Sequence, residues 1–341
     1  MSHAGSRRIF RPIASLDAFP PEFSSRPVHL GIGNFDGFHC GHRAIFRRAK
    51  SAAASSGGIV GALTFSPHPE VFFRGSGAVE QIFPRERKNE LFSEAGLDFA
   101  VYEPFNAAFA AIEAEDFPAL LLKKIPSLRG IYIGGNFHFG AHRRGDAKLL
   151  KKLCAARGVA VGTVAPVNFD GARVSSTRIR LALTAGNVRA AGEMLGEPYR
   201  CCGNVIRGNR LGREIGFPTL NLEWNPECRP RFGVYVVRLS VPATGAVFRG
   251  VANYGVRPTV EKNAAFPLLE TFLPDISSGT PLPTYDDFIC VEWLDFLRPE
   301  MRFPGLDALK AQLARDRDAC EAFPRERRTE FRGRAQRNSL S

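Results

Sequence analysis

The sequence predicts two different folds in series: an α/β parallel-sheet, Rossmann-like domain followed by a small antiparallel β-barrel domain. Between Val28 and about Val164, short apolar runs alternate with longer helical stretches rich in Ala and Leu, which is typical of parallel strands joined by crossover helices. From Tyr199 onward the chain is dense in Gly, Pro and β-branched or aromatic residues, as in a barrel of short strands. A chain of 341 residues also exceeds the usual length of one domain.

The individual elements follow from the same patterns. In the first domain, strands are predicted at Val28–Ile32, Ile59–Phe65, Phe99–Tyr102, Gly130–Ile133 and Val159–Val164. Helices are predicted at Arg43–Ser55, Arg85–Ala95, Ala114–Lys124, Ala147–Arg157 and Ser176–Leu195. In the barrel, strands are predicted at Cys202–Arg207, Val234–Leu239, Val247–Asn253, Leu268–Leu273 and Phe288–Phe296, with a closing helix over Gly305–Glu321.

These elements divide the chain into four parts. We expect an N-terminal extension at 1–25, the α/β domain at 26–196, the barrel with its terminal helix at 197–321 and a basic tail at 322–341. The tail holds six Arg against two Glu and few apolar residues, so we expect it to be disordered.

Composition narrows the functional class. The net charge is +12, which suits nucleic acid, a membrane surface or anionic substrates such as ATP. No apolar run is long enough for a membrane span, and the N-terminus lacks the apolar segment of a secretion signal. The seven cysteines are odd in number and scattered, without metal-type CxxC pairs. We therefore expect a cytoplasmic protein whose cysteines are all reduced.

A glycine-rich loop between the first strand and the first helix carries the first chemical signal. It reads Gly31-Ile-Gly-Asn-Phe-Asp-Gly-Phe-His-Cys-Gly-His42. Glycines allow close approach of a ligand, and free N–H groups at a helix start bind anions. Two histidines three residues apart can project to the same side and donate to phosphates as charge develops there. A structural Gly-rich turn with incidental histidines is the alternative. The candidate residues are Gly33, Asn34, Phe35, Asp36, His39, Gly41 and His42.

A second phosphate clamp is expected at Val174-Ser-Ser-Thr-Arg-Ile-Arg180. Its hydroxyls serve as helix caps in any case. Together with a guanidinium group suited to bidentate contact, they also fit a polyphosphate. The candidate residues are Ser175, Ser176, Thr177 and Arg178.

The barrel begins with another glycine-rich segment, which runs from Gly203 to Asn221. Gly208, Gly212 and Arg213 suggest a flap over phosphates, with a plain Gly-rich hairpin as the alternative. Thr219 and Asn221 are two residues apart, so on a strand both side chains face one side and can supply oxygen ligands to Mg²⁺.

In order along the chain, these motifs resemble those of the bacterial bifunctional riboflavin kinase/FAD synthetases. The resemblance rests on GNFDGFHCGH, Thr64-Phe-Ser-Pro-His-Pro69, Gly134-Gly-Asn-Phe-His-Phe-Gly140 with Arg144-Gly-Asp146, SSTRIR, PTLN, Asn253-Tyr-Gly-Val-Arg-Pro-Thr259 and Leu269-Glu-Thr271. It extends from about Val28 to Asp318. It implies a nucleotidyltransferase domain followed by a riboflavin kinase barrel, with riboflavin, FMN, FAD and ATP as ligands and Mg²⁺ as cofactor.

The resemblance also implies roles for residues. His39 and His42 would hold the ATP phosphates, and the flavin pocket would include His68, Asn136, Phe137 and Asp146. Glu270 would be the general base that deprotonates the riboflavin 5′-hydroxyl for attack on the γ-phosphate of ATP. A strand-paired structural Glu is the alternative.

Three positions depart from the family pattern. Cys40 replaces an aliphatic residue, His138 replaces Arg, and Phe272 replaces the His that usually follows Glu-Thr, with a longer loop at 274–286. The departures in the barrel leave open a narrower function, an FMN adenylyltransferase whose barrel is degenerate or regulatory. The basic net charge leaves open a third, a basic nucleic-acid-binding protein. For the latter, interleaved basic and aromatic residues on one face are expected, whereas here the charge lies largely in motif loops and the tail.

Overall fold

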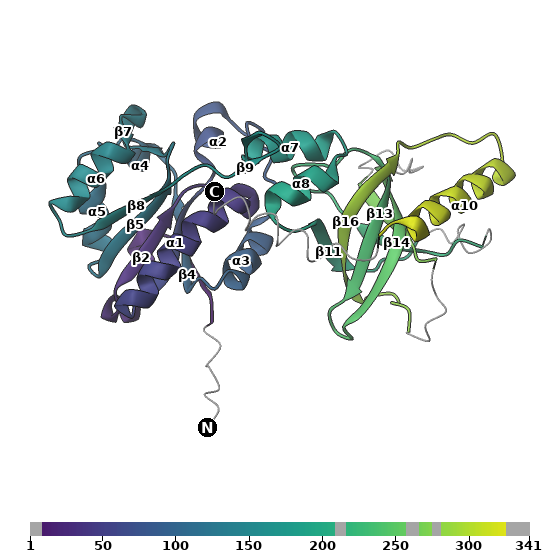
Figure 1. Ribbon diagram of the computed structural model, residues 1–341, viewed down its shortest axis with the longest axis horizontal. Helices are drawn as coiled ribbons and strands as arrows, with labels where there is room; N and C mark the ends of the chain where they lie inside the picture. Colours follow the sequence, from purple (N-terminus) through teal and green to yellow (C-terminus); the bar gives the residue numbers. More distant parts are fainter. Residues whose placement is uncertain (1–8, 209–215, 257–265, 275–280, 325–341) are drawn as a thin grey trace, which may run out of the picture. The chain divides into compact units, whose positions relative to one another are not determined.

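The computed structural model describes residues 9–208, 216–256, 266–274 and 281–324. The chain forms two compact units, Met1–Ser176 and Thr177–Ser341, coloured purple to teal and teal to yellow in Figure 1. The domain boundary expected at 196/197 stays a prediction. The two compact units of the structure divide after Ser176, so two helices lie between that division and the expected boundary. Gly212, Arg213 and most of the expected tail lie outside the described residues.

The first unit is built on a parallel sheet with the strand order β1-β4-β3-β2-β5-β8. Every neighbouring pair is parallel, which confirms the predicted α/β class. The strands are β1 (Arg11–Ile13), β2 (Val28–Ile32), β3 (Ile59–Ser66), β4 (Phe99–Pro104), β5 (Leu128–Gly134) and β8 (Ala160–Val164). The edge strand β1 lies within the residues expected to form the N-terminal extension.

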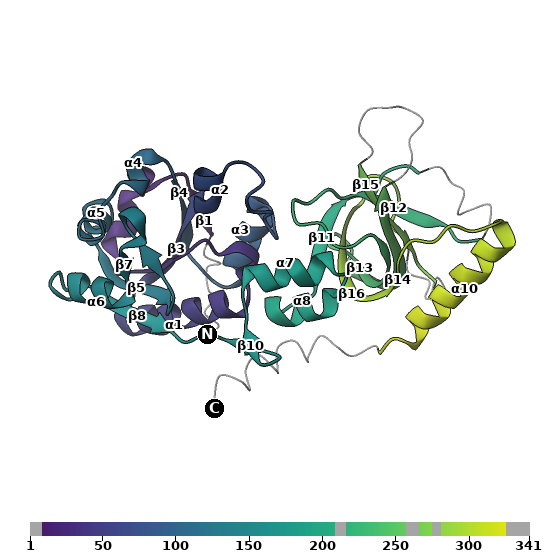
Figure 2. The same ribbon diagram turned by 90° about the horizontal axis from the view of Figure 1, so that it is seen from above.

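Helices cover both faces of this sheet (Figure 2). On one face, Leu30 of β2 belongs to a buried cluster with Leu121 and Leu150. On the other face, Gly31 leaves room for the Phe46 ring, because a Cβ there would lie 2.5 Å from it. The main helices are α1 (Cys40–Ser56), α3 (Arg85–Glu94), α5 (Phe117–Lys124) and α6 (Ala147–Ala155), with short α2 (Pro69–Arg74) and α4 (Ala107–Ala110).

Short elements complete the first unit. The 3-10 turns are η1 (Leu16–Ala18), η2 (Pro21–Ser25), η3 (Asp36–Phe38) and η4 (Ala141–Arg143). The two small hairpins pair β6 (His138–Phe139) with β7 (Gly145–Asp146), and β9 (Asn168–Phe169) with β10 (Ala172–Arg173).

The strand order reverses at β2, and this reversal indicates the position of a candidate site. The chain passes from β2 to β3 on one side of it, while β5, later in sequence, pairs on its other side. Open parallel sheets bind ligands outside the carboxyl ends of the strands at such a switch point. The loops that follow β2, β3, β4 and β5 therefore gather at one edge of the sheet.

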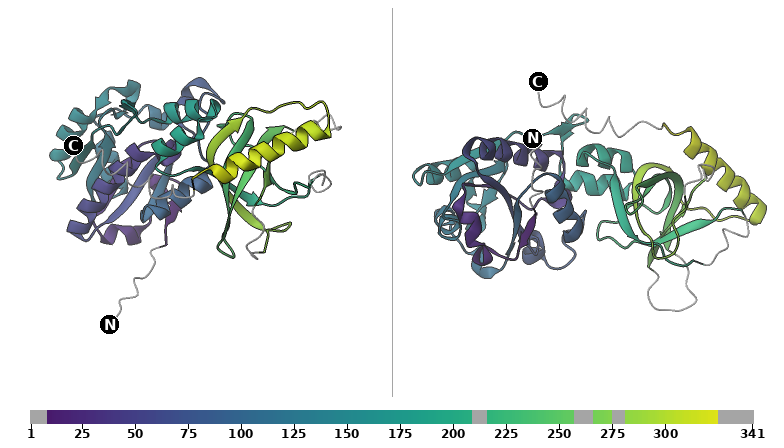
Figure 3. Two further views of the ribbon diagram at one scale, coloured as in Figure 1. Left: turned by 45° about the vertical axis from the view of Figure 1, so that its right-hand side comes forward. Right: turned by 90° about the horizontal axis from the view of Figure 1, so that it is seen from below.

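The second unit begins with two helices and continues as an antiparallel sheet (Figure 3). The helices are α7 (Ser176–Thr184) and α8 (Val188–Leu195). The sheet order is β11-β16-β13-β14-β15-β12, and an isolated bridge between Ile206 and Asn221 brings the two ends together. This curled sheet confirms the predicted barrel. Its elements are β11 (Tyr199–Asn204), β12 (Thr219–Glu223), β13 (Gly233–Val241), β14 (Ala246–Val256), β15 (Pro267–Phe272), β16 (Phe288–Arg298) and the last helix α10 (Leu306–Ala322).

Two predicted helices differ from the structure for local reasons. The continuous helix expected over Ser176–Leu195 is interrupted, because Gly186 has a φ of +85° and Asn187 caps a new helix. The helix expected from Ala114 begins at Phe117, with a proline in its first turn, where the missing N–H is not needed.

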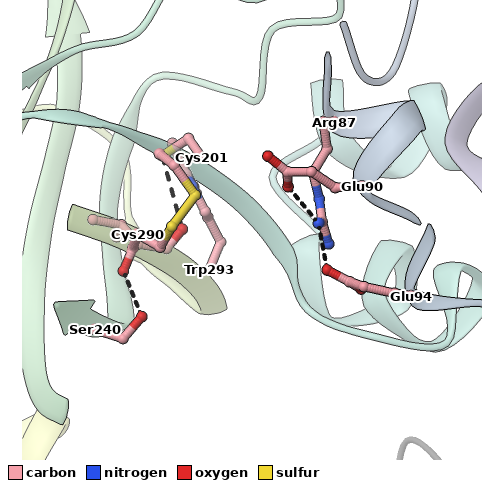
Figure 4. The surroundings of a disulfide bond; sticks show 9 residues. Arg87, Glu90, Glu94, Cys201, Ser240, Cys290 and Trp293 are labelled. Carbon is pink, nitrogen blue, oxygen red and sulfur yellow. Dashed lines mark hydrogen bonds and ion pairs between the residues drawn. A yellow bond between two sulfur atoms is a disulfide. The ribbon is translucent and has the colours of Figure 1, made fainter. Parts of the chain in front are cut away.

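The expectation that all cysteines are reduced is wrong for one pair. Antiparallel pairing of β11 with β16 sets Cys202 opposite Cys290, with their Cα atoms 4.1 Å apart, and the two form a disulfide. Figure 4 shows this bond, with Cys201 and Trp293 nearby. The partners are 88 residues apart in sequence, so spacing alone does not reveal them. The other five cysteines take no part in this disulfide and are buried.

Candidate functional site

The glycine-rich loop after β2 makes a tight turn into α1. Phe35 and Phe38 have φ values of 49° and 40°, and Gly37 has one of 74°. Such left-handed conformations are uncommon for residues with a side chain. The turn is held by packing, because the rings of Phe35 and Phe38 are fully buried. It ends at His39, which caps α1 and accepts from the backbone N–H of His42 at 3.4 Å.

The structure brings His39 and His42 together as a stacked pair. Their ring centroids lie 3.6 Å apart, and a Cβ on Gly41 would lie 3.1 Å from the His39 ring. Burial is the main cause that lowers the pKa of His39 to about 4 and the pKa of His42 well below its usual range, with Arg173 and, for His42, Lys88 adding repulsion. Both rings are therefore neutral near pH 7. His42 Nδ1 is buried without a hydrogen-bond partner in the described part of the chain.

Hydrogen bonds fasten the loop to its neighbours. The Ser176 hydroxyl donates to the Asp36 carbonyl at 2.9 Å, and the Asp36 carboxylate accepts from the Ile82 N–H at 3.0 Å. The Asn34 side chain bonds His68 Nε2 at 2.8 Å. Two pairs of predicted residues, Asn34 with His68 and Asp36 with Ser176, are thus hydrogen-bonded to each other, and the loop connects the two pairs.

The remaining predicted residues of the first site are less closely linked. Asn136 and Phe137 follow β5, where the Phe137 ring stacks on Phe139. Asp146 caps α6, and the N–H of Leu149 lowers the pKa of its carboxyl group; its expected place in the flavin pocket stays a prediction. Gly33 lies against Phe35, Ser175 precedes α7, and Thr177 and Arg178 lie on its first turn.

Sequence reasoning missed an aromatic cluster at the same sheet edge. It centres on Phe105, just after β4, whose ring lies 5.6–5.7 Å from four others. Two of them, Phe72 and Phe73 on α2, are 37% and 66% exposed. Exposed aromatic rings gathered beside His68 suit the flat face of an aromatic ligand. We name this the Phe105 cluster: Phe65, Phe72, Phe73, Phe105 and Phe109.

In the second unit, strand register aligns three polar residues across three strands. Glu270 of β15 pairs with Asn221 of β12 on one side and with Asn253 of β14 on the other. Directly opposite residues point to the same face, with Cβ atoms about 4.5–5.5 Å apart. Thr219 and Phe272 form the next pair along that face. The predicted Thr219, Asn221 and Glu270 therefore share one surface.

Gly208 lies close to this polar row. The N–H of Ile206 donates to the Asn221 carbonyl at 2.9 Å, and a Cβ on Gly208 would meet the Asn221 amide at 2.2 Å. Only glycine fits against the amide at this distance. Of the three flap candidates, Gly208 is the one that lies within the described residues.

The oxygen atoms of the row fit a hard cation. Asn221 is 4% exposed, and its Oδ1 is buried without a hydrogen-bond partner among the residues that the structure describes. Such an orphaned amide oxygen is costly unless a donor or a cation meets it. Clusters of three or more His, Cys, Asp or Glu that could hold a metal are absent from the described residues. The Thr219 and Asn221 side chains offer oxygen donors, which suit Mg²⁺ better than a soft metal.

Together, the fold and the candidate sites are typical of a two-unit transferase, with a stacked histidine pair on a parallel sheet and a carboxylate row on an antiparallel half-barrel. Residues 23–178 match the family model described as FAD synthetase, and residues 195–323 match the one described as riboflavin kinase. A Haemophilus influenzae protein named bifunctional riboflavin kinase/FMN adenylyltransferase is 35% identical over 86% of this chain and 93% of its own length. One of the same name from Escherichia coli K12 is 34% identical over 93% and 97%.

The chain belongs to the bifunctional riboflavin kinase/FMN adenylyltransferase family. Its fold is also similar to a crystal structure titled macrolide-efflux protein from Streptococcus pneumoniae, with a TM-score of 0.80, 28% identity and coverage of 93% of this chain and all of that one. No helix in the described ranges is long and apolar enough to cross a membrane.

Proposed function

We propose that this protein makes both flavin cofactors: it phosphorylates riboflavin to FMN with ATP in its second unit, and adenylylates FMN to FAD with release of pyrophosphate in its first. The observation that carries the proposal is that one chain holds two separate sites, the stacked histidine pair and the Glu270 row. The matches to both family models support two activities over an adenylyltransferase with a degenerate barrel.

At the first site, the neutral rings of His39 and His42 donate hydrogen bonds to the phosphates of ATP. The N-terminal N–H groups of α1 add the partial positive charge of a helix start. The Phe105 cluster offers its exposed rings to the isoalloxazine ring of FMN, with His68 and Asn136 at the neighbouring strand ends. The FMN phosphate attacks the α-phosphate of ATP, and pyrophosphate leaves from the histidine side.

At the second site, Glu270 accepts the proton of the riboflavin 5′-hydroxyl as that oxygen attacks the γ-phosphate. Thr219 and Asn221 would hold Mg²⁺, which supplies charge neutralisation at the phosphates when bound. Gly208 brings its backbone against the Asn221 amide, which supports a role for it beside the phosphate chain. Gly212 and Arg213, which lie outside the described residues, are proposed to bind the phosphates with it. We also propose that the protein acts in the cytoplasm.

The test is incubation of the full chain with riboflavin, ATP and Mg²⁺ and separation of the flavins by chromatography. His42→Ala should let FMN accumulate without FAD, and Glu270→Gln should stop FMN formation while added FMN is still converted to FAD. If the wild-type protein makes neither product, the proposed function is wrong.

Two matched controls separate chemistry from folding. His142 is exposed in η4 with a φ of 54°, so His142→Asn keeps a residue that tolerates that conformation. Glu321 is exposed on α10, and Glu321→Gln removes a carboxylate far along the chain from Glu270. Both variants should make FMN and FAD at wild-type rates.

A further inference from the structure

A buried lysine lies directly beside the nucleotide loop. Lys88 is on α3, four residues before Phe92, so the two share a face of the helix. The Phe92 ring contacts Phe38 at 5.1 Å and Phe35 at 6.0 Å, and this face of α3 is therefore directed at the loop. Lys88 Nζ donates to the Asn34 carbonyl at 3.4 Å, and the same oxygen accepts from Thr64 Oγ1 at 2.9 Å.

The burial of Lys88 is unusual. The residue is only 5% exposed, whereas lysines normally extend their ammonium group into water, because burial of a charge is costly. Lys50 shows the ordinary arrangement: it is exposed, and its Nζ donates to the Ala95 carbonyl at 2.7 Å at the surface. A lysine that only fastened the loop could do so from the surface in the same way.

The histidine pair leaves a need for positive charge. Neutral rings stacked 3.6 Å apart can donate hydrogen bonds, but they do not balance the several negative charges of a triphosphate. The cations that act on His42 are Lys88 and Arg173. Arg173 is exposed on β10, where water screens it, while a buried charge acts through a lower dielectric constant and is stronger.

We infer that Lys88 is a further residue of adenylyl transfer: its ammonium group supplies the fixed positive charge that binds the β- and γ-phosphates of ATP and stabilises pyrophosphate as it leaves. This inference rests on the proposed function of the first unit. The bond that breaks lies between the α-phosphorus and its bridging oxygen. The charge that builds on that oxygen is stabilised by Lys88, which transfers no proton and stays an ammonium.

The first experiment measures kcat/KM for FAD formation from FMN and ATP, together with inhibition by inorganic pyrophosphate. Lys88→Met keeps the length and loses the charge. We expect kcat/KM to fall about 10²-fold and pyrophosphate to bind about tenfold more weakly. Lys88→Arg should retain more activity than Lys88→Met. Lys50→Met removes an exposed lysine from the same unit and should leave both constants unchanged.

A second readout tests the charge itself. NMR titration of the histidines should give His42 a higher pKa in Lys88→Met than in the wild type, because loss of a neighbouring cation favours the protonated ring. Burial, His39 and Arg173 remain as the other causes that lower the pKa of His42. A lysine that served only to pack α3 against the loop would not produce this shift together with weaker pyrophosphate binding.

Three outcomes decide the inference. If folded Lys88→Met keeps kcat/KM and pyrophosphate affinity within twofold of the wild type, the inference is overturned even though FAD synthesis stands. If the wild type makes no FAD, the proposed function itself fails. If Lys88→Met does not fold, Lys88→Ala is assayed with added ethylammonium, and with tetramethylammonium at equal ionic strength as the control. Recovery of FAD formation with ethylammonium alone supports the inference. Equal activity with both salts overturns it.

Discussion

At the scale of single residues, buried histidines link the proposed nucleotide site to the stability of the fold. His39 is 6% exposed, and its pKa falls from 6.5 to about 4 in the folded protein, chiefly through burial. Between these pH values the unfolded chain binds more protons than the folded one, so the free energy of unfolding decreases as pH falls. The pKa values of His29 and His42 are also lowered by burial, and they act in the same direction.

We predict that His39→Asn weakens this pH dependence. Asn caps a helix well, so it retains the bond to the His42 N–H but cannot titrate. The wild-type first unit should lose on the order of 3 kcal/mol more than the variant between pH 6.5 and 4, as measured by hydrogen exchange of its core amides. His138→Asn, at an exposed histidine, should keep the wild-type loss. Equal losses in His39→Asn and the wild type would contradict the prediction.

Asn253 carries the second residue-scale prediction. It faces Glu270 directly across β14 and β15, where an amide can donate to the carboxylate and hold it toward the riboflavin hydroxyl. Asn253→Asp places two carboxylates opposite each other, which disfavours the ionised base. Riboflavin phosphorylation should therefore fall roughly tenfold at pH 6 and recover towards pH 9. Adenylylation of added FMN at the first site is the internal control and should not change.

At the scale of elements, the disulfide joins β11 to β16. It closes a loop of 88 residues in the sequence, and cross-links over loops of this size typically contribute about 2–4 kcal/mol. We predict that Cys202→Ala lowers the melting temperature of the second unit under non-reducing conditions. Reductant should lower that of the wild type to a similar value and leave that of the variant almost unchanged.

Tryptophan fluorescence can follow the melting of the second unit, and peptide mapping can detect the disulfide directly. Trp293 lies in the same sheet, and its Nε1 donates to Cys201 Sγ at 3.4 Å, so tryptophan fluorescence reports melting of this region. Peptide mapping without reductant should find Cys202 linked to Cys290. Recovery of both as free thiols from protein purified under oxidising conditions contradicts the prediction.

Much of the element pattern could be predicted from local sequence, and the exceptions have physical reasons. The strand Val28–Ile32 is predicted with its observed bounds, because Val28, Leu30 and Ile32 form a short, largely apolar run of β-type residues. The strand Arg11–Ile13 was not predicted, since three residues carry no periodic signal and their pairing with β4 is non-local. The first helix starts at Cys40, three residues earlier than expected, because a histidine is not a usual cap.

For the candidate sites, too, local spacing could be predicted from the sequence, but strand register and packing could not. Thr219 and Asn221 could be placed on one face from their spacing alone. The position of Asn253 opposite Glu270 could not, because it depends on the order and register of strands. Lys88 was missed because a lysine among charged residues of a helix ordinarily indicates a solvated face, and only the packing of Phe92 on the loop directs it inward.

At the scale of the whole molecule, the two sites lie in separate compact units, so each reaction should survive loss of the other. We predict that an equimolar mixture of His42→Ala and Glu270→Gln converts riboflavin to FAD although neither variant does so alone. FMN must leave one molecule and bind another, so FAD should appear after a lag that shortens with protein concentration. If the mixture makes only FMN, transfer between the sites requires one intact chain.

The register of β15 has a consequence for how this chain can vary. Side chains on a strand alternate between faces, so an insertion of one residue ahead of Leu269 in β15 would turn the Glu270 carboxylate away from Asn221 and Asn253 and present Leu269 in its place. An insertion after Leu273, beyond the end of the strand, would leave that alignment intact. Length added after Leu273 would therefore leave β15 in register, whereas a single codon added within β15 would displace the proposed kinase base.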